Sequence, residues 1–259
     1  MRDMLEEHFK DAEANPIQRA KELAKRELPK RFYKSVGVKP TEDGLFVVQL
    51  DGRTVRTPAK EILSVESEAL AKAIAAEWDA QEKEINPGLM PLTRIANSAQ
   101  DAVGDKFAEV ADVITSYAGN DALCYRAENP DRLVQQQTEL WDPILRWAEA
   151  QLEGQFTLAA GVMPVMQSDE LLAAFRAKLE AHSPIELTAF HTLTTLTGSA
   201  VLALALREGF VSPDDVWAAA HVEEDWNIEL WGEDAEAKAM RAYKRQEFDA
   251  AVLVLLGAE

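Results

Sequence analysis

Residues 47–58 read VVQLDGRTVRTP and contain the only clear β-sheet signal in the chain. An apolar run ends at Leu50, and Asp51-Gly52 then supplies two residue types that adopt the positive φ angles of a tight hairpin turn. The following residues return as the partner strand, and Pro58 stops the pairing because it has no backbone N–H to donate. The stretch predicts a small antiparallel sheet in the N-terminal part of the chain.

Beyond the hairpin, almost every segment has the apolar periodicity of a helix. Ser64 can cap a helix in which Leu70, Ile74 and Trp78 recur at four-residue spacing, and Asn129-Pro130 can open a later one. Three further helices are expected to start at a serine that can act as an N-cap: Ser168, Ser183 and Ser212. The predicted fold class is α+β, with a small β-containing N-terminal domain followed by a mostly α-helical C-terminal domain.

Two of these serine-capped helices have predicted ends in the C-terminal half. The Ser183 helix is expected to continue to Gly209 and to be the most buried element, because apolar residues recur along its whole length. The Ser212 helix is expected to reach about Trp231, where Gly232 interrupts it. The expected regions are an N-terminal arm at 1–30, the β-containing domain at 31–125 and the helical domain at 126–259.

The charge of the chain excludes several classes of partner. Its 259 residues include 45 acidic and 27 basic side chains, for a formal net charge of −18. Nucleic acids and anionic membrane surfaces are not expected to bind, because both need clustered Lys and Arg. Residues 1–60 carry 13 basic against 10 acidic side chains, so the acidity lies in the remainder of the chain. No apolar run approaches the length of about 20 residues that spans a bilayer.

Several kinds of chemistry lack their usual residues. The glycines form neither a phosphate-binding P-loop nor a dinucleotide fingerprint, so neither a P-loop nucleotide site nor any other cofactor is predicted. Cys124 is the single cysteine, which excludes an intramolecular disulfide, and we interpret it as a buried, inert thiol. The N-terminus mixes acids with bases and lacks an apolar segment, so it predicts neither a signal nor a transit peptide, and the expected location is the cytoplasm of a bacterium.

A metal site has one weak candidate. The chain has four histidines and no H-E-x-x-H motif, but His221 and Glu224 would share a face of a helix. A structural or catalytic metal needs three or four ligands, and two are visible here. No metal is predicted, and a metal-dependent enzyme that uses His221 and Glu224 is kept as the alternative function.

The strongest functional signal is an acidic segment near the C-terminus. Seven carboxylates lie within fourteen residues, with no base until Lys238: Glu223, Glu224, Asp225, Glu229, Glu233, Asp234 and Glu236. A solvated helix face explains the acids but not the interleaved Trp226 and Trp231. Acids edged by aromatic rings are typical of a docking surface for a basic partner. Both interpretations stay open on these residues alone.

Three other residues are ambiguous. Trp78 lies in a helix between Glu77 and Asp79, and a structural role in packing that helix onto the sheet is favoured over contact with a ligand. Arg94 and Asn97 follow a proline break on adjacent helical turns. They can bind a partner or bridge locally, and the sequence does not decide between these roles.

Several of these segments together resemble the Atp12 family of assembly chaperones. The resemblance extends over roughly residues 30–240 and rests on five segments in order: KRFYK, VVQLDGRTVRTP, AAEWDAQ, PLTRIANSAQD and VEEDWNIELWG. It implies a non-enzymatic protein that assists assembly of the F1 sector of ATP synthase by binding the free α subunit before β joins. It also implies a bacterial member, since mitochondrial members carry an import presequence.

The resemblance assigns roles to residues. The family's functional glutamate corresponds to Glu223, with Glu224 as the neighbouring possibility, and its tryptophan corresponds to Trp78. The predicted partner-binding set is Glu223, Glu224, Asp225, Trp226 and Glu229. A generic chaperone that protects many clients through apolar surface remains a further alternative.

Overall fold

The computed structural model describes residues 28–160 and 165–257, and its elements confirm the predicted α+β fold class. The expected N-terminal arm lies outside the described residues except for its last three. None of the helices among the described residues combines the length and the apolar character that crossing a membrane requires.

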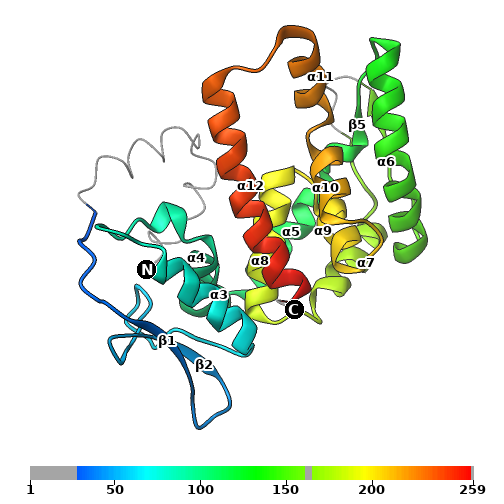
Figure 1. Ribbon diagram of the computed structural model, residues 1–259. Helices are drawn as coiled ribbons and strands as arrows, with labels where there is room; N and C mark the ends of the chain where they lie inside the picture. The colour runs from blue at the N-terminus through cyan, green and yellow to red at the C-terminus, as the bar shows by residue number, and fades with distance from the viewer. Residues whose placement is uncertain (1–27, 161–164, 258–259) are drawn as a thin grey trace. The chain divides into compact units, whose positions relative to one another are not determined.

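The chain divides into two compact units, the first extending to Asp105 and the second spanning Lys106–Leu255. The first unit contains the main sheet, and the second is helical apart from two short strands (Figure 1). The domain boundary near residue 125 stays a prediction.

The sheet of the first unit is built around β2 (Phe46–Leu50). β1 (Val36–Pro40) pairs antiparallel along all of β2, and the short strands β3 (Arg53–Thr54) and β4 (Ser64–Val65) pair with its opposite ends. Asp51 and Gly52 have φ angles of 49° and 79°, so the predicted hairpin turn with two positive φ angles is present.

Helix α3 (Glu68–Asp79) covers this sheet and contacts β1 and β2. Its buried side chains, Leu70, Ala71 and Ile74, lie on one face of the helix. The N-cap is Ser67, whose hydroxyl accepts a hydrogen bond from the Leu70 N–H. The expected cap, Ser64, belongs to β4, so the sequence prediction placed the start of this helix three residues too early.

A carboxylate connects α3 to the next helix, α4 (Pro91–Ser98). Glu77 accepts hydrogen bonds from the backbone N–H groups of Leu92 (2.7 Å) and Thr93 (2.8 Å), which have no acceptor within the helix. Burial raises the pKa of Glu77 above its ordinary value, although these hydrogen bonds favour the charged form. A short 3₁₀ turn, η1 (Pro87–Leu89), precedes α4 and a π-helical turn, η2 (Ala99–Val103), follows it.

The second unit packs its helices around α9 (Ala200–Arg207), whose residues are buried except for Arg207 at its end. α9 contacts α5, α6, α8 and α10. The other helices of the unit are α5 (Phe107–Gly119), α6 (Asp131–Leu152), α7 (Asp169–Leu179), α8 (Pro184–Thr197), α10 (Pro213–Ala220), α11 (Val222–Trp231) and α12 (Ala235–Leu256). The predicted caps at Ser168, Ser183 and Ser212 are confirmed, since each hydroxyl accepts a backbone N–H.

Two helices that the sequence predicted as continuous are broken. The helix from Ser183 stops at Gly198, whose φ of 70° lies in the left-handed region, and α9 restarts after it. The fully buried carboxylate of Asp121 accepts the N–H of Val201 (2.9 Å) in the first turn of α9 and the N–H of Leu123 (3.1 Å). A side chain distant in sequence therefore stabilises the break.

Cys124 ends a 3₁₀ turn, η3 (Ala122–Cys124), directly before β5 (Tyr125–Arg126), which pairs in parallel with β6 (Ala159–Ala160). The thiol is buried, as expected. Burial, with a smaller contribution from the Asp121 charge, raises the pKa of Cys124 to about 12. The side chain therefore stays a thiol at neutral pH and is a poor nucleophile.

Candidate functional site on helix α11

Helix α11 begins at a sharp break after α10, where the sequence predicted one helix from Ser212 to Trp231. His221 stands at the break with a φ of −116° and ψ of 16°. Its buried ring stacks on Trp217 at a centroid distance of 4.0 Å, and its Nδ1 lies 2.8 Å from the Trp217 carbonyl oxygen. Burial lowers the pKa of His221, so the ring is neutral near pH 7 and can donate its Nδ1–H to that carbonyl.

One face of α11 lies against α6, with Glu223, Trp226 and Glu229 following each other at three-residue spacing. The amide Nε2 of Gln137 donates to Glu223 Oε1 over 2.8 Å, and Gln137 Oε1 accepts the Ala127 N–H over 2.8 Å. Gln137 is itself buried, so its amide is fixed from both ends. The Glu223 carboxylate is therefore held in one orientation although its residue is exposed.

A single arginine of α6 contacts the other two residues of this face. Arg132 forms an ion pair with Glu229 (Nη2 to Oε1, 2.6 Å), and its guanidinium carbon lies 5.3 Å from the centre of the Trp226 ring. Both ends of the ion pair are about half exposed to solvent, which limits its contribution to at most about 1 kcal/mol. Trp226 is half-buried beneath this contact.

Two further acids of α11 point to other neighbours. Asp225 pairs with Arg241 of α12 (Oδ1 to Nη1, 2.5 Å), and hydrogen bonding to Asp225 raises the pKa of Arg241. Glu224 lies 3.8 Å from Nε2 of His221. Figure 1 shows α11 between α6 and α12 at one end of the second unit, which agrees with these contacts. Ion pairs and hydrogen bonds on both sides, rather than a buried apolar face, hold the helix.

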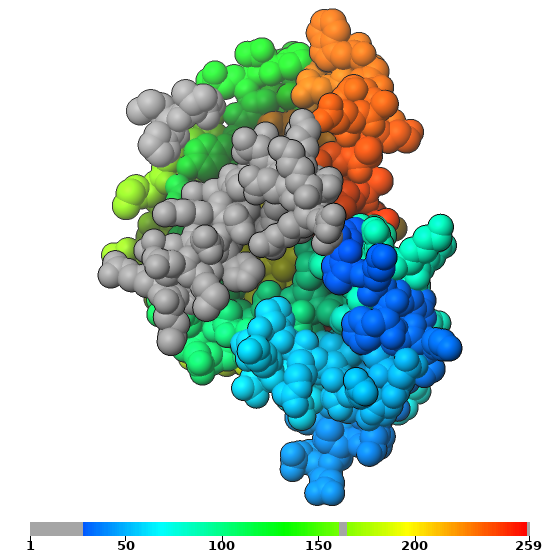
Figure 2. All heavy atoms as spheres, turned by 90° about the vertical axis from the view of Figure 1, so that its left-hand side faces the viewer, coloured from blue at the N-terminus to red at the C-terminus, as the bar shows by residue number. Residues whose placement is uncertain are grey.

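The segment keeps an excess of negative charge. Among the residues that the structure describes, three basic side chains pair with its seven carboxylates: Arg132, Arg241 and Lys238. Figure 2 shows the orange atoms of α11 at the molecular surface beside the green atoms of α6. The exposed acids can therefore interact with a basic group outside the chain.

In the pair that suggested a metal site, the histidine has another partner. His221 uses one ring nitrogen for the Trp217 carbonyl and directs the other toward Glu224. Within residues 28–160 and 165–257, no group of three or more His, Cys, Asp or Glu side chains is placed to hold a metal ion.

The predicted partner-binding set includes Trp226 but neither of the most exposed apolar residues of this helix, although the sequence analysis noted Trp231 among the acids. Trp231 is 85% exposed and Leu230 is 51% exposed, both in the last turn of α11. The local signal for them was Gly232, which follows directly and ends the helix. Large side chains in the final turn before such a stop have fewer helical neighbours to cover them.

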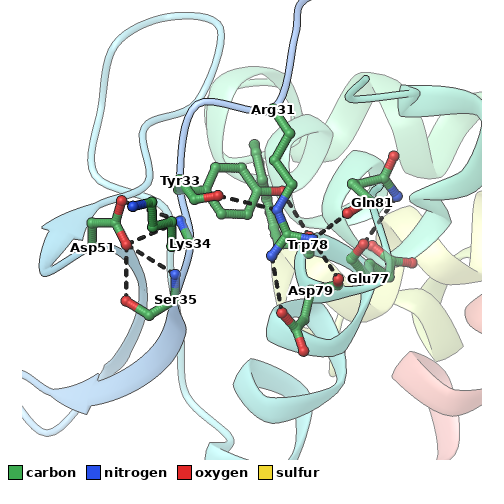
Figure 3. Close-up of polar contacts among 9 residues, drawn as sticks. All are labelled: Arg31, Tyr33, Lys34, Ser35, Asp51, Glu77, Trp78, Asp79 and Gln81. Carbon is green, nitrogen blue, oxygen red and sulfur yellow. Dashed lines mark hydrogen bonds and ion pairs between the residues drawn. The ribbon is translucent and has the colours of Figure 1, made fainter. Parts of the chain in front are cut away.

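Trp78 lies in the first unit, in a different local setting from the acidic helix. It is half-buried, its ring meets Tyr33 edge-on at 5.9 Å, and its carbonyl oxygen accepts the Tyr33 hydroxyl at 2.6 Å (Figure 3). Arg31 covers the Tyr33 ring at 4.6 Å and pairs with Asp79 at 3.1 Å. These contacts attach the segment before β1 to the end of α3. A structural role for Trp78 stays a prediction, as do the roles of Arg94 and Asn97, which are half-buried in α4.

Comparison with known proteins shows which family this chain resembles. Residues 30–149 match the family model of the ATP12 chaperone protein. The crystal structure of Atp12 from Paracoccus denitrificans is 40% identical, covers 88% of this chain and 99% of its own, and superimposes with a TM-score of 0.78. The chain belongs to the Atp12 family of chaperone proteins.

Two other relatives extend the Atp12 match beyond residue 149. Atu1473 from Agrobacterium tumefaciens, a proposed chaperone of known structure, is 46% identical with a TM-score of 0.84, covering 93% of this chain and 91% of its own. The mitochondrial protein atp12 of Schizosaccharomyces pombe is 25% identical over 238 residues, which are 86% of this chain and 81% of the yeast protein. The shared fold therefore includes the helical unit that carries α11.

Proposed function

We propose that this Atp12 family member assists assembly of the F1 sector of ATP synthase by binding the free α subunit through helix α11. The family membership supports the chaperone role, and the acidic surface supports a basic partner. The observation that carries the choice of site is the fixed carboxylate of Glu223. It is exposed to solvent yet oriented by the buried amide of Gln137.

The mechanism follows from the problem that an unassembled subunit presents. A free α subunit exposes the surface that β will later cover, and such a surface is prone to aggregate. The exposed carboxylates of α11 would occupy basic groups on that surface until β replaces the chaperone. Pre-orientation by α6 reduces the entropy that a carboxylate loses when it meets an arginine, which favours binding without a large contact area.

The test is co-expression of the chain with isolated F1 α or β subunit, followed by size-exclusion chromatography. The wild-type chain should form a soluble complex with the α subunit and no complex with the β subunit. Glu223→Lys should lose that complex, because the reversed charge repels the basic partner. The matched control is Glu208→Lys at the end of α9. It is the same reversal in the same unit, at a helix C-terminus where a positive charge is favourable.

The folding of Glu223→Lys has to be measured alongside binding. The substitution removes the acceptor of the buried Gln137 amide, and an unsatisfied buried donor costs about 1–3 kcal/mol. Glu223→Gln keeps an acceptor oxygen for Gln137 but has no charge, so its binding shows the contribution of the charge alone.

A complex with β, or with neither subunit, would reject the proposal. Equal suppression of aggregation for unrelated proteins would instead support a generic chaperone. The bacterial cytoplasm stays the predicted location.

A further inference from the structure

The end of α11 presents an apolar corner that the acidic residues do not explain. Trp231 and Leu230 occupy the last helical turn, and Gly232, with a φ of 84°, then turns the chain toward α12. The first five residues of α12 are also exposed, and three of them are alanines: Ala235, Ala237 and Ala239. The exposed residues on both sides of Gly232 therefore include both large and small apolar side chains.

An exposed tryptophan of this kind is unusual. Tryptophan is largely buried on average, and transferring such a ring from water to an apolar environment is strongly favourable. At 85% exposure, Trp231 gains almost none of that stabilisation in the isolated chain. Tryptophan is also the residue type most enriched among residues that dominate binding energies. The ring is therefore available to a partner at little conformational cost.

The charges around the corner define the chemistry of that partner. Glu229, Glu233, Asp234 and Glu236 lie within five residues of Trp231. Among the described residues, Arg132 pairs with Glu229 at 2.6 Å and Lys238 with Glu233 at 2.9 Å, which leaves an excess of acid. Asp234 accepts the N–H groups of Glu236 and Ala237, which holds its carboxylate at the start of α12. A complementary surface has an apolar pocket with lysines or arginines at its rim.

We propose that Trp231, supported by Leu230, is the apolar anchor of the client interface and inserts into a pocket with a basic rim on the F1 α subunit. This proposal rests on the proposed function and adds to it the residues that supply most of the binding energy. The acids of α11 orient the client, and the tryptophan holds it. Trp226 does not fill this role, because Arg132 of α6 covers its ring.

The experiment is a binding titration of labelled F1 α subunit against wild type, Trp231→Ala and Trp231→Phe. Trp231→Ala should weaken the complex at least tenfold, the effect of removing a dominant interface tryptophan, and Trp231→Phe should be intermediate. Melting temperatures should be unchanged, because the ring is largely in water before binding. The matched control is Met166→Ala, at a residue of the same unit that is 88% exposed.

The salt dependence of the binding affinity distinguishes the contribution of Trp231 from that of the acidic residues. Loss of an apolar contact should weaken binding by the same factor at every salt concentration, whereas Glu223→Lys should flatten the salt dependence. If Trp231→Ala binds the α subunit within twofold of the wild-type affinity, Trp231 is not the anchor. The result for Glu223→Lys tests the proposed function separately. If wild-type protein does not bind α at all, the proposed function and the anchor both fail.

Discussion

Helices α9 and α11 belong to the same unit and have similar lengths, eight and ten residues, but they are stabilised in opposite ways. Residues Ala200–Leu206 of α9 are all buried, and its one charged residue stands at the end. In α11 only Val222 is buried, and four of ten residues are carboxylates. Within one compact unit, α9 belongs to the core, whereas α11 carries the surface that we propose for recognition.

The contacts of each helix show why this separation is useful. α9 is held by close packing and by hydrogen bonds to Asp121, so changes there act on the free energy of unfolding. α11 is held by Gln137, Arg132 and Arg241, contacts that are each worth at most a few kcal/mol. Its exposed side chains can therefore change with less effect on the fold than the buried side chains of α9.

The largest expected effect comes from the same truncation made in both helices. Leu204→Ala in α9 removes a fully buried side chain and should lower the free energy of unfolding by about 2–5 kcal/mol. Leu230→Ala in α11 removes a half-exposed one and should lower it by less than about 0.5 kcal/mol. Urea unfolding monitored by circular dichroism measures both. Equal losses would show that α11 is as much a part of the core as α9.

The same contrast explains what the sequence could predict. The hairpin turn at Asp51-Gly52 and the caps at Ser168, Ser183 and Ser212 are local signals and were predicted correctly. The break at Gly198 was missed because apolar residues continue across it and the carboxylate that stabilises the restart is Asp121, 80 residues before Val201. The periodicity of nearby residues cannot reveal a contact between residues so far apart in the sequence.

For the candidate site, composition identified the acidic segment but not its surroundings. Glu223 and Glu229 stand out as part of a carboxylate run, whereas their partners Gln137 and Arg132 precede them by 86 and 97 residues. No local pattern marks those two residues as neighbours of α11. The exposure of Trp231 likewise depends on how α11 and α12 meet, which only the fold determines.

A pH-dependent effect is expected at Asp121, which anchors α9. Burial raises the pKa of Asp121 to about 6 from 3.8, so the folded state binds its proton more tightly than the unfolded state. Its stabilising contribution is therefore full below about pH 3.8 and is lost as pH rises through 6. The shift corresponds to about 3 kcal/mol.

Asp121→Asn isolates this contribution, because asparagine keeps an acceptor oxygen and does not titrate. The difference in unfolding free energy, wild type minus variant, should fall by about 3 kcal/mol between about pH 3 and pH 8. Urea titrations across that range would measure it. A difference independent of pH would mean that the carboxyl keeps its ordinary pKa despite complete burial.

The smallest expected effect concerns how α11 is held on α6. Arg132→Gln removes the ion pair with Glu229 and the contact with Trp226, and because both charges are half exposed it should lower the free energy of unfolding by at most about 1 kcal/mol. Local opening is a more sensitive readout than global stability. Hydrogen exchange of the α11 amides should accelerate severalfold, whereas Arg176→Gln, which removes ion pairs of α7, should leave them unchanged. Unchanged exchange in Arg132→Gln would mean that Gln137 and Arg241 alone hold the helix. Glu229 could then leave Arg132 and pair with a basic group of the proposed client at no structural cost.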